Sequence, residues 1–313
     1  MSSNGKIKNI LGRICYYSGM ARLLLEFIRS KLIIVTYHRI TGQEENPRYF
    51  GLHQDIFEQQ IVFLKKHFKI VPFCEGIGCF NSGSIKKPLL VLSFDDGYRD
   101  NYLYAFPLLK KHNITATIFL TTGFIETEKR FWWDVVADMI TSSPNLKLGL
   151  NEKNNLAEDI NALLKRMSVE QRRREIEKLK EKYGSNGNDR KEREILNWEE
   201  IREMSDYGIE FGSHTLTHPN LTFLSRDELK NEILKSKKIL EESLGKKICG
   251  FAYPYGFYNN DAKRIVHEAD YLYARSMING SNSIGDDVFA LKCVSGFVYT
   301  IEDFIVRMSC RAL

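Results

Sequence analysis

A strand-like apolar run that stops at two adjacent carboxylates constrains the fold of this chain more than any other feature. Residues 89–94 are apolar except for one serine, and Asp95, Asp96 and Gly97 follow directly. The run predicts a buried strand that delivers two acids to the end of a sheet. Neighbouring carboxylates there repel each other and lose hydration together, which a metal ion or a proton-transfer role can offset. The alternative is a solvated turn, in which Asp and Gly serve turn geometry.

Strand-like and helix-like patterns alternate over most of the remaining chain. This alternation predicts a largely parallel sheet covered by helices, and 313 residues are enough to enclose a sizeable core. Strands are expected at 32–39, 69–73, 89–94, 116–120, 209–213, 248–253, 271–275 and 289–293. Helices are expected at 57–66, 105–112, 198–204, 227–244 and 262–269.

Charge and cysteine content narrow the class of protein. The net charge of +5 arises from 45 basic and 40 acidic residues mixed along the chain, so we expect no nucleic-acid partner. The six cysteines are scattered through a chain too long to need disulfides, which is typical of reduced thiols. Cys74 and Cys79 lack the second cysteine pair or histidine cluster that a structural zinc site needs.

The N-terminus has a character of its own. Residues 6–30 mix basic side chains with isoleucine, leucine and phenylalanine, which predicts an amphipathic helical segment within residues 1–30. Such a segment either makes a peripheral membrane contact or packs on its own domain. It lacks the pattern of a secretory signal, and no uncharged apolar run reaches the roughly 20 residues of a membrane span. We therefore expect a cytoplasmic protein that touches at most the inner face of the membrane.

The segment from about 126 to 197 interrupts the alternation, and we interpret it as a helical insertion near the active edge of the sheet. It includes Trp132 and Trp133, which either stack on a sugar ring or anchor the insertion to the core. Further on, acidic and basic residues alternate around 172–180. This pattern favours a solvated helix with ion pairs four residues apart over a nucleic-acid patch.

Two histidines follow another predicted strand. His214 and His218 are four residues apart, and one helical turn would bring them to the same side so that both reach one ion. Taken alone, this spacing is more often incidental than metal-binding. The histidines and the Asp pair, however, both lie at the downstream ends of predicted parallel strands, where α/β folds assemble their sites.

Together these residues suit metal-assisted hydrolysis. Two imidazoles and one carboxylate are a usual set of protein ligands for a catalytic divalent metal. We assign Asp96, His214 and His218 to the metal and leave Asp95 as the general base. Tyr255, in a Pro-Tyr-Gly sequence at a third strand end, could offer its backbone N–H to an oxyanion. Zinc is the first expectation, and the same ligands accept cobalt, nickel or iron.

These motifs resemble those of a known family. In order, SFDDG at 93–97, SHTLTH at 213–218 and YPYG at 253–256 resemble the first three motifs of the polysaccharide deacetylases, carbohydrate esterases with a NodB-type domain. The resemblance covers roughly residues 32–304. It implies an irregular (β/α) barrel of about seven parallel strands within residues 31–313, and metal-dependent removal of N-linked acetyl groups from an amino sugar. It also implies the same roles for the five site residues named above.

The chain departs from the family pattern at two points. The third motif usually carries an arginine two residues before the proline, where this chain has Ala252, so the partner of Asp95 is either missing or comes from elsewhere. Arg275, near another strand end, is our candidate. The last motif normally supplies a late histidine as general acid, but no histidine follows His267. The Tyr-His-Arg-Ile sequence around His38 resembles the N-terminal motif of the branch that acts on poly-N-acetylglucosamine, and we expect His38 to be the acid.

Two classes of function remain open from sequence. The first is a hydrolase that removes an N-acetyl or similar N-acyl group from an amino sugar in a cell-surface polysaccharide or a lipid-linked glycan. The second is a non-catalytic carbohydrate-binding protein on the same fold, suggested by the missing arginine and the missing late histidine. A structural protein without a ligand is disfavoured, because packing alone does not require four polar residues at strand ends.

Overall fold

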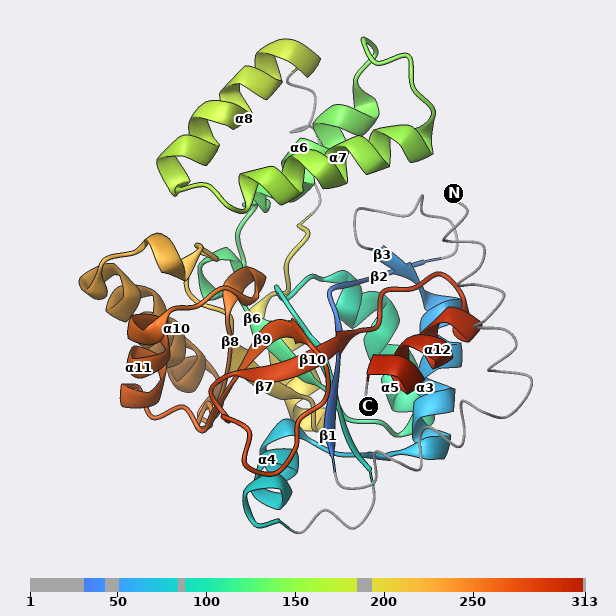
Figure 1. Ribbon diagram of the computed structural model, residues 1–313, viewed down its shortest axis with the longest axis vertical. Helices are drawn as coiled ribbons and strands as arrows, with labels where there is room; N and C mark the ends of the chain where they lie inside the picture. The colour runs from blue at the N-terminus through green and yellow to red at the C-terminus, as the bar shows by residue number, and fades with distance from the viewer. Residues whose placement is uncertain (1–30, 43–50, 84–87, 185–192, 312–313) are drawn as a thin grey trace.

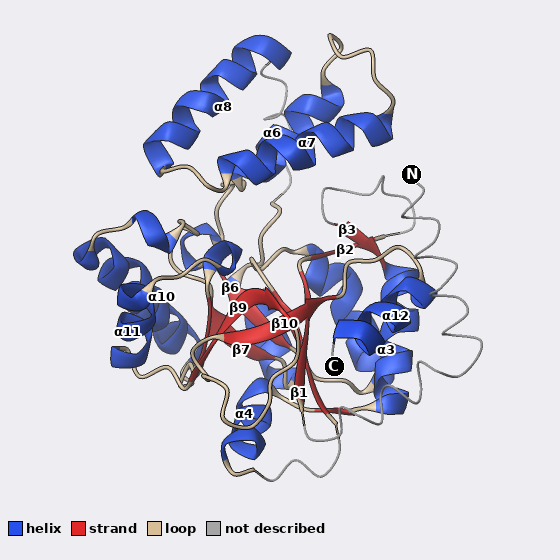
Figure 2. Cartoon of the chain, viewed as in Figure 1, coloured by secondary structure: helices blue, strands red, loops and turns tan. Residues whose placement is uncertain are grey.

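Seven parallel strands form a closed barrel at the centre of the protein, which confirms the predicted irregular (β/α) barrel. The computed structural model describes residues 31–42, 51–83, 88–184 and 193–311. The strand order is β1, β10, β9, β8, β7, β6, β5, and β5 pairs with β1 to close the ring (Figures 1 and 2). The barrel strands are β1 (Leu32–Tyr37), β5 (Leu89–Phe94), β6 (Thr117–Leu120), β7 (Glu210–Ser213), β8 (Gly250–Ala252), β9 (Tyr273–Asn279) and β10 (Leu291–Ser295).

Strand β5 is enclosed on both edges. One edge pairs with β1 along its whole length, from Leu89 to Phe94. The other edge pairs with the short strand β4 (Lys69–Ile70) at its start and with β6 at its end. Every residue of β5 is buried, as the apolar run predicts. The two acids that follow β5 therefore lie at the carboxyl rim of the barrel.

Side chains of the barrel strands alternate between two apolar cores. Leu32 and Ile34 of β1 belong to the core inside the barrel, whereas Ile33 and Val35 belong to the core between the strands and the outer helices. This is the two-residue period of a strand that is covered on both faces.

Helix α4 (Phe73–Asn81) closes the amino end of the barrel. Phe73, Ile77 and Phe80 join the inner core, and the Phe73 ring stacks on Tyr273 of β9 with ring centroids 4.0 Å apart. Figure 1 shows this helix at the end of the barrel opposite the insertion. With its amino end filled by apolar side chains, the barrel presents its polar residues at the carboxyl end.

The remaining helices surround the barrel or extend from it. A short parallel pair, β2 (Arg39–Thr41) and β3 (Gly51–His53), lies beside the rim. The surrounding helices are α3 (Gln54–His67), α5 (Phe106–His112), α9 (Trp198–Tyr207), α10 (Arg226–Leu244), α11 (Asn260–Glu268) and α12 (Ile301–Arg311).

Three helices of the predicted insertion stand together beyond the barrel (Figure 1). They are α6 (Trp132–Ser142), α7 (Leu150–Leu164) and α8 (Val169–Tyr183). Their small core includes Val136, Ile140, Ala157 and Leu164. Helix α8 begins with a capping box at Ser168 and carries exposed ion pairs such as Lys178 with Glu175, three residues apart.

One predicted strand is shorter than expected, and one predicted segment lies outside the described residues. The strand predicted at 69–73 is only two residues long, because Pro72 lacks an N–H for a ladder and Phe73 already starts α4. The amphipathic segment at 1–30 lies outside the described residues, so the membrane contact and the cytoplasmic location remain predictions. Among the helices that the structure describes, none is both long enough and apolar enough to cross a bilayer.

Candidate active site

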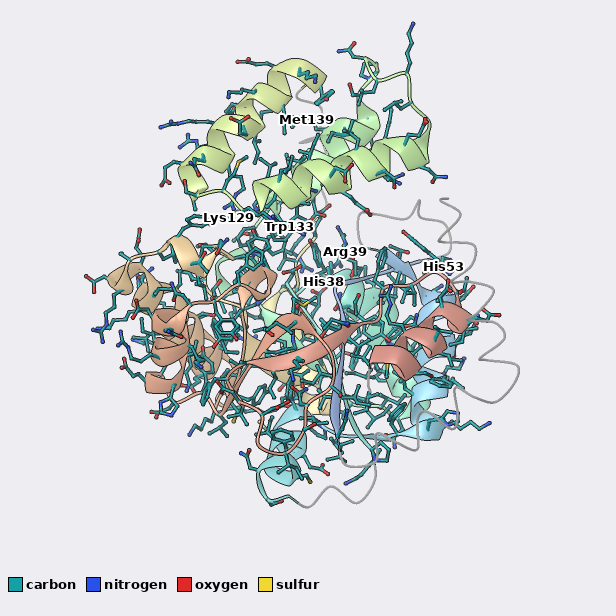
Figure 3. All side chains as sticks on the ribbon, in the orientation of Figure 1. His38, Arg39, His53, Lys129, Trp133 and Met139 are labelled. Carbon is teal, nitrogen blue, oxygen red and sulfur yellow. The ribbon has the colours of Figure 1, made fainter. Side chains whose placement is uncertain are left out.

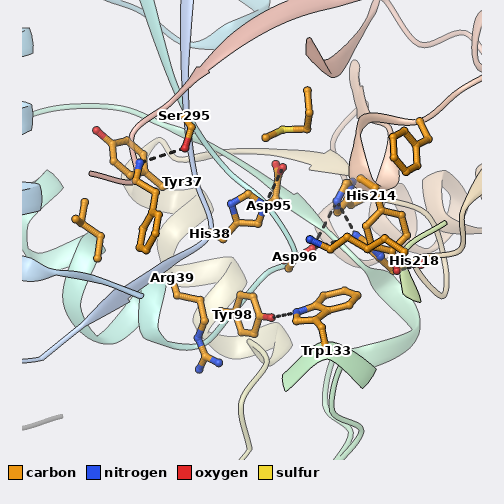
Figure 4. A pocket seen from close by; sticks show the side chains of 16 residues that line it. Tyr37, His38, Arg39, Asp95, Asp96, Tyr98, Trp133, His214, His218 and Ser295 are labelled. Atoms are coloured by element: carbon orange, nitrogen blue, oxygen red, sulfur yellow. Dashed lines mark hydrogen bonds and ion pairs between the residues drawn. The ribbon is translucent and has the colours of Figure 1, made fainter. Parts of the chain in front are cut away.

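The two carboxylates after β5 occupy a tight, buried turn. Asp95 and Asp96 are only 2% and 3% exposed, which excludes the solvated turn. Asp96 and Gly97 have left-handed φ angles of 73° and 80°, and a Cβ on Gly97 would lie 2.7 Å from the side chain of Leu120. Only glycine fits both the angle and the space. The turn lets two consecutive acids face the same cavity (Figure 4).

The prediction that a helical turn aligns His214 and His218 is wrong. The residues after β7 form an irregular loop, in which Thr215 and His218 have left-handed φ angles of 69° and 58°. The loop nevertheless brings the two imidazoles together, with ring centroids 4.7 Å apart. Reversals of the backbone, and not helical periodicity, therefore place both rings on one side.

A carboxylate from α10 holds this loop. Glu232 is buried and accepts hydrogen bonds from the backbone N–H groups of Leu216, at 2.9 Å, and Thr217, at 2.8 Å. It also accepts one from the Thr217 hydroxyl at 2.6 Å. Bonds to a charged acceptor are stronger than neutral ones, so Glu232 fixes a backbone conformation that would otherwise be strained.

Three ligand atoms converge at the carboxyl rim in the geometry of a metal site. Nε2 of His214 lies 3.1 Å from Nε2 of His218, and the Oδ1 atom of Asp96 lies 3.5 Å and 3.3 Å from these nitrogens. Ligands about 2.1 Å from a tetrahedral zinc ion are about 3.4 Å apart. Asp96 Oδ1 is buried and has no hydrogen-bond partner. The donor set therefore fits a divalent cation, and among the described residues it is the one cluster of this kind.

The tautomer of His214 follows from its neighbour. Its Nδ1 lies 2.7 Å from the backbone carbonyl of Ala252, which can only accept, so Nδ1 carries the proton and Nε2 presents a lone pair. Burial lowers the pKa of His214 to about 4, which keeps the ring neutral. At Asp96, burial opposes ionisation, but the neighbouring imidazoles of His218, His38 and His214 lower the pKa overall.

The partner of Asp95 is Arg275. Arg275, on β9, is fully buried and donates from Nη2 to Oδ1 of Asp95 across the barrel interior. Burial would lower the pKa of this guanidinium, but the charge of Asp95 and the hydrogen bond to it, together with Cys293, raise the pKa overall. The arginine that the third motif lacks is therefore supplied by another strand, at the position that the sequence suggested.

His38 lies on the other side of Asp95. Its Nε2 is 3.8 Å from Asp95 Oδ2, and its side chain is 34% exposed at the cavity. Asn101 donates a 2.9 Å hydrogen bond to the backbone carbonyl of His38 and so fixes the end of β1. Figure 4 shows His38 beside Asp95 and apart from the two metal-site histidines.

Aromatic side chains form a wall of the cavity and attach the insertion to the barrel. The Tyr255 ring packs edge-on against His218, with centroids 4.5 Å apart, and its hydroxyl accepts a 2.9 Å bond from Trp132. Trp133 donates to the Tyr98 hydroxyl at 2.8 Å. Anchoring is thus one role of the tryptophan pair. Trp133 also lines the cavity and faces the barrel above His38 (Figure 3).

The cavity has a volume of about 240 Å³ and contains residues that sequence reasoning missed. Tyr98, two residues after Asp96, could have been found from the motif. Lys165, from the end of α7, could not, because its approach depends on how the insertion folds back. Burial lowers the pKa of Lys165, while Asp96 and Glu158 oppose that shift.

The fold and site define a parallel (β/α) barrel with a candidate metal centre and a paired acid at its carboxyl rim. The family model described as polysaccharide deacetylase matches residues 82–274, more than half of the chain. The chain therefore belongs to the polysaccharide deacetylase family, as its motifs indicated.

Relatives extend the match along the chain. A poly-β-1,6-N-acetyl-D-glucosamine N-deacetylase of Staphylococcus aureus (strain MRSA252) is 22% identical over 275 residues, covering 81% of this chain and 74% of the relative. The Bacillus subtilis protein YxkH, assigned by name to the polysaccharide deacetylases, is 24% identical over 209 residues. That match covers 66% of this chain and 52% of YxkH, so the chain spans about half the length of that relative.

Solved structures share the fold. The deacetylase PplD of Streptococcus pyogenes, solved with acetate, superposes with a TM-score of 0.61 at 19% identity, covering 88% of this chain and 97% of that one. IcaB from Ammonifex degensii gives a TM-score of 0.61 at 21% identity, covering 90% and 97%.

Proposed function

We propose that the protein hydrolyses the N-acyl group, acetyl in the first instance, of an amino sugar, with a divalent metal held by Asp96, His214 and His218. The observation that carries the proposal is the convergence of these three ligand atoms beside a second, arginine-paired acid in one cavity. Membership of the polysaccharide deacetylase family supports the same class of reaction.

A divalent metal bound there would act as a Lewis acid toward the acyl carbonyl and would make a water molecule easier to deprotonate. Asp95 is the proposed base. One of its oxygens is held by Arg275, and the other faces His38. Because Arg275 fixes the carboxylate in place, the free oxygen is positioned to take a proton from the attacking water.

His38 is the proposed acid. Hydrolysis adds water to the carbonyl carbon and breaks the C–N bond, so the leaving nitrogen needs a proton to depart as an amine. The position of His38, partly exposed at the cavity, supports this role. The products are a carboxylic acid and the free amino sugar. The backbone N–H of Tyr255 remains the proposed donor to the oxyanion.

The proposed substrate is an N-acetylated amino sugar in a polysaccharide or a lipid-linked glycan. The Staphylococcus aureus relative is named for a β-1,6-linked N-acetylglucosamine polymer, and this makes short oligomers of that polymer the first substrates to test. The alternative is a binding protein without activity, which the missing arginine and the missing late histidine suggested. The first of these reasons no longer applies, because Arg275 pairs with Asp95.

The test is the release of acetate from β-1,6-linked N-acetylglucosamine oligomers by the zinc-loaded protein. Asp95→Asn should lower the rate by about 10²- to 10⁴-fold, because it removes the base, while the metal content stays at that of the wild type. Asp206→Asn, at an exposed position, is the matched control and should match the wild type. Acetate release by Asp95→Asn at the wild-type rate would contradict the proposal.

A further inference from the structure

The two metal-site histidines are held in different ways. Nδ1 of His214 lies 2.7 Å from the backbone carbonyl of Ala252, the last residue of barrel strand β8. Nδ1 of His218 is also buried, but no described residue makes a hydrogen bond with it. A histidine that binds a metal usually donates its second ring nitrogen to a nearby acceptor, and that bond sets the orientation of the ring. The orientation of His218 therefore has to come from other contacts.

Three aromatic rings pack against the imidazole of His218. Each contact is edge-to-face, with ring centroids 4.5 Å away at Tyr255, 4.7 Å at Trp133 and 5.7 Å at Phe131. His218 is only 5% exposed, so these rings take the place of solvent around it. Close-packed neighbours restrict the rotation of a buried side chain, and edge-to-face aromatic pairs have a preferred geometry. The three rings can therefore orient the imidazole without a hydrogen bond to Nδ1.

Two of these three rings belong to the insertion. Phe131 directly precedes α6, and Trp133 is the second residue of that helix. The two rings are stacked, with centroids 4.3 Å apart and an interplanar angle of 9°, and both are almost fully buried. Figure 4 shows Trp133 beside the metal-site histidines. The insertion thus reaches the metal site through the start of its first helix.

Hydrogen bonds hold Trp133 itself in place. Its indole N–H donates to the Tyr98 hydroxyl at 2.8 Å, and that hydroxyl donates to Oδ2 of Asp134 at 2.7 Å. Its backbone carbonyl accepts a 3.1 Å hydrogen bond from the side chain of Asn161, a buried residue of α7. A buried polar network of this kind makes the position of a side chain rigid. Trp133 can therefore serve as a firm support for the imidazole.

The third ring, Tyr255, is also attached to the insertion. The indole N–H of Trp132 can only donate, and it meets the Tyr255 hydroxyl at 2.9 Å. That hydroxyl donates in turn to the backbone carbonyl of His218 at 3.4 Å. The Trp132 ring is covered by the guanidinium of Arg172, a buried residue of α8, at 4.9 Å from the ring centre. All three rings around His218 are therefore part of the insertion or bonded to it.

We propose that the docked insertion orients His218 for the metal, with Trp133 as the positioning residue, so that metal binding and docking of the insertion stabilise each other. This inference rests on the metal site of the proposed function. An imidazole that is already held with Nε2 toward the ion loses less freedom when the metal binds, and the affinity is higher for that reason. Coupling between two binding events is reciprocal, so bound metal should also stabilise the docked insertion.

The first test is the zinc affinity of the purified protein, measured by competition with a chromophoric chelator, which needs no substrate. Trp133→Leu keeps an apolar side chain but removes the flat ring, and the dissociation constant for zinc should rise about 10- to 100-fold. Trp133→Phe restores a ring and should recover most of the affinity. Trp198→Leu is the matched control and should bind zinc like the wild type, because Trp198 packs on the outer core and is not part of the cavity lining.

Hydrogen exchange measures the reciprocal effect. Zinc should slow the exchange of backbone amides in α6 and α7 of the wild type more than in α4, which lies at the other end of the barrel and reports the overall stabilisation by a ligand. In zinc-saturated Trp133→Leu this difference between the helices should disappear. Equal slowing of all three helices in the wild type would show that the metal does not act on the insertion, and would overturn the inference.

Three results of the affinity measurement separate the inference from the proposed function. Wild-type zinc affinity in Trp133→Leu overturns the inference and leaves the metal site intact. An equal loss of affinity in Trp198→Leu also overturns it, because the effect is then one of general stability. A folded wild type that binds neither zinc nor cobalt counts against the proposed function itself, and the inference falls with it.

Discussion

Two carboxylates at opposite ends of the same barrel have different hydrogen-bond environments. Glu210, at the start of β7, accepts hydrogen bonds from the backbone N–H groups of Phe73, at 2.7 Å, and Cys74, at 3.3 Å, and from the Thr117 hydroxyl at 3.1 Å. Asp96, beyond the end of β5, leaves one buried oxygen without a hydrogen bond and faces two imidazoles. The first carboxylate completes the start of a helix, and the second presents a buried oxygen beside the two imidazoles.

The difference teaches how to separate a structural acid from a functional one in this fold. At the amino end, Glu210 meets the orphan N–H groups of α4 and stabilises the helix that plugs the barrel. At the carboxyl end, a desolvated oxygen without a partner costs free energy, and such costs are concentrated at sites that bind ligands. The distinction lies in what each carboxylate meets: one oxygen of Glu210 accepts from N–H and O–H donors, whereas Asp96 Oδ1 is buried without a donor and lies beside two imidazoles.

Backbone strain follows the same division. Seven described residues other than glycine have a positive φ, and four of them, Asp96, Thr215, His218 and Tyr255, lie at the carboxyl end in or beside the site. Left-handed backbone is costly for such residues and persists only where the surroundings enforce it. The carboxyl end therefore stores strain in three residues that have a proposed role, Asp96, His218 and Tyr255, and in Thr215 of the histidine loop.

The largest effect should come from removing the imidazoles. His214→Ala/His218→Ala should reduce bound zinc from about one equivalent to none and abolish acetate release, because one carboxylate alone cannot hold the ion. Elemental analysis of the purified proteins measures this, with circular dichroism as the check on folding. Full metal content in the double variant would contradict the assignment of the metal site to the carboxyl end of the barrel.

The next largest effect should follow from breaking the ion pair inside the barrel. Arg275→Met leaves Asp95 buried without its partner, and the free energy of unfolding should fall by about 3–5 kcal/mol in urea titrations. Asp95→Asn/Arg275→Met removes both charges and should recover part of that loss, which a double-mutant cycle quantifies. A loss below about 1 kcal/mol in the single variant would mean that the pair does not stabilise the site.

A smaller effect is expected at the amino end. Glu210→Gln keeps the shape but weakens charge-assisted bonds to α4, so the free energy of unfolding should fall by about 1.5–3 kcal/mol. Zinc content and acetate release should match the wild type, because the site lies at the other end of the barrel. A loss of metal in this variant would show that the two ends are coupled.

Asp134, a buried carboxylate of helix α6, sharpens the comparison through pH. Burial raises the pKa of Asp134 to about 7, from an ordinary 3.8. Between these values the folded protein holds a proton that the unfolded chain has released, so the stability contributed by Asp134 decreases as the pH rises. Asp134→Asn cannot titrate, so its melting temperature should gain about 2–4 °C relative to the wild type between pH 5 and pH 7.5. Parallel melting curves across that range would contradict the assignment.

The sequence by itself determined the scaffold and the identity of the candidate ligands. The apolar run of β5 dictates a strand, and the acids and glycine after it dictate where that strand stops. Alternating strands and helices indicate a parallel sheet, whose strands have their carboxyl ends at one edge, and the resemblance to a known family adds the expectation of a barrel. Because these signals are local patterns of polarity, they can be read before any contact is known. They correctly predicted that Asp96, His214 and His218 lie close together. The predicted helical turn between the histidines, however, is an irregular loop.

The tertiary structure alone decided how these residues are held. Arg275 meets Asp95 across 180 positions of sequence, and Glu232 shapes the histidine loop from a neighbouring helix. Lys165 lines the cavity because the insertion docks on the rim, where Asn220 donates a hydrogen bond to its backbone carbonyl. Closure of the ring and docking of the insertion set these pairings. Local periodicity cannot predict these contacts. Buried charges pair with groups that are near them in the folded protein, and such groups can be far away along the chain.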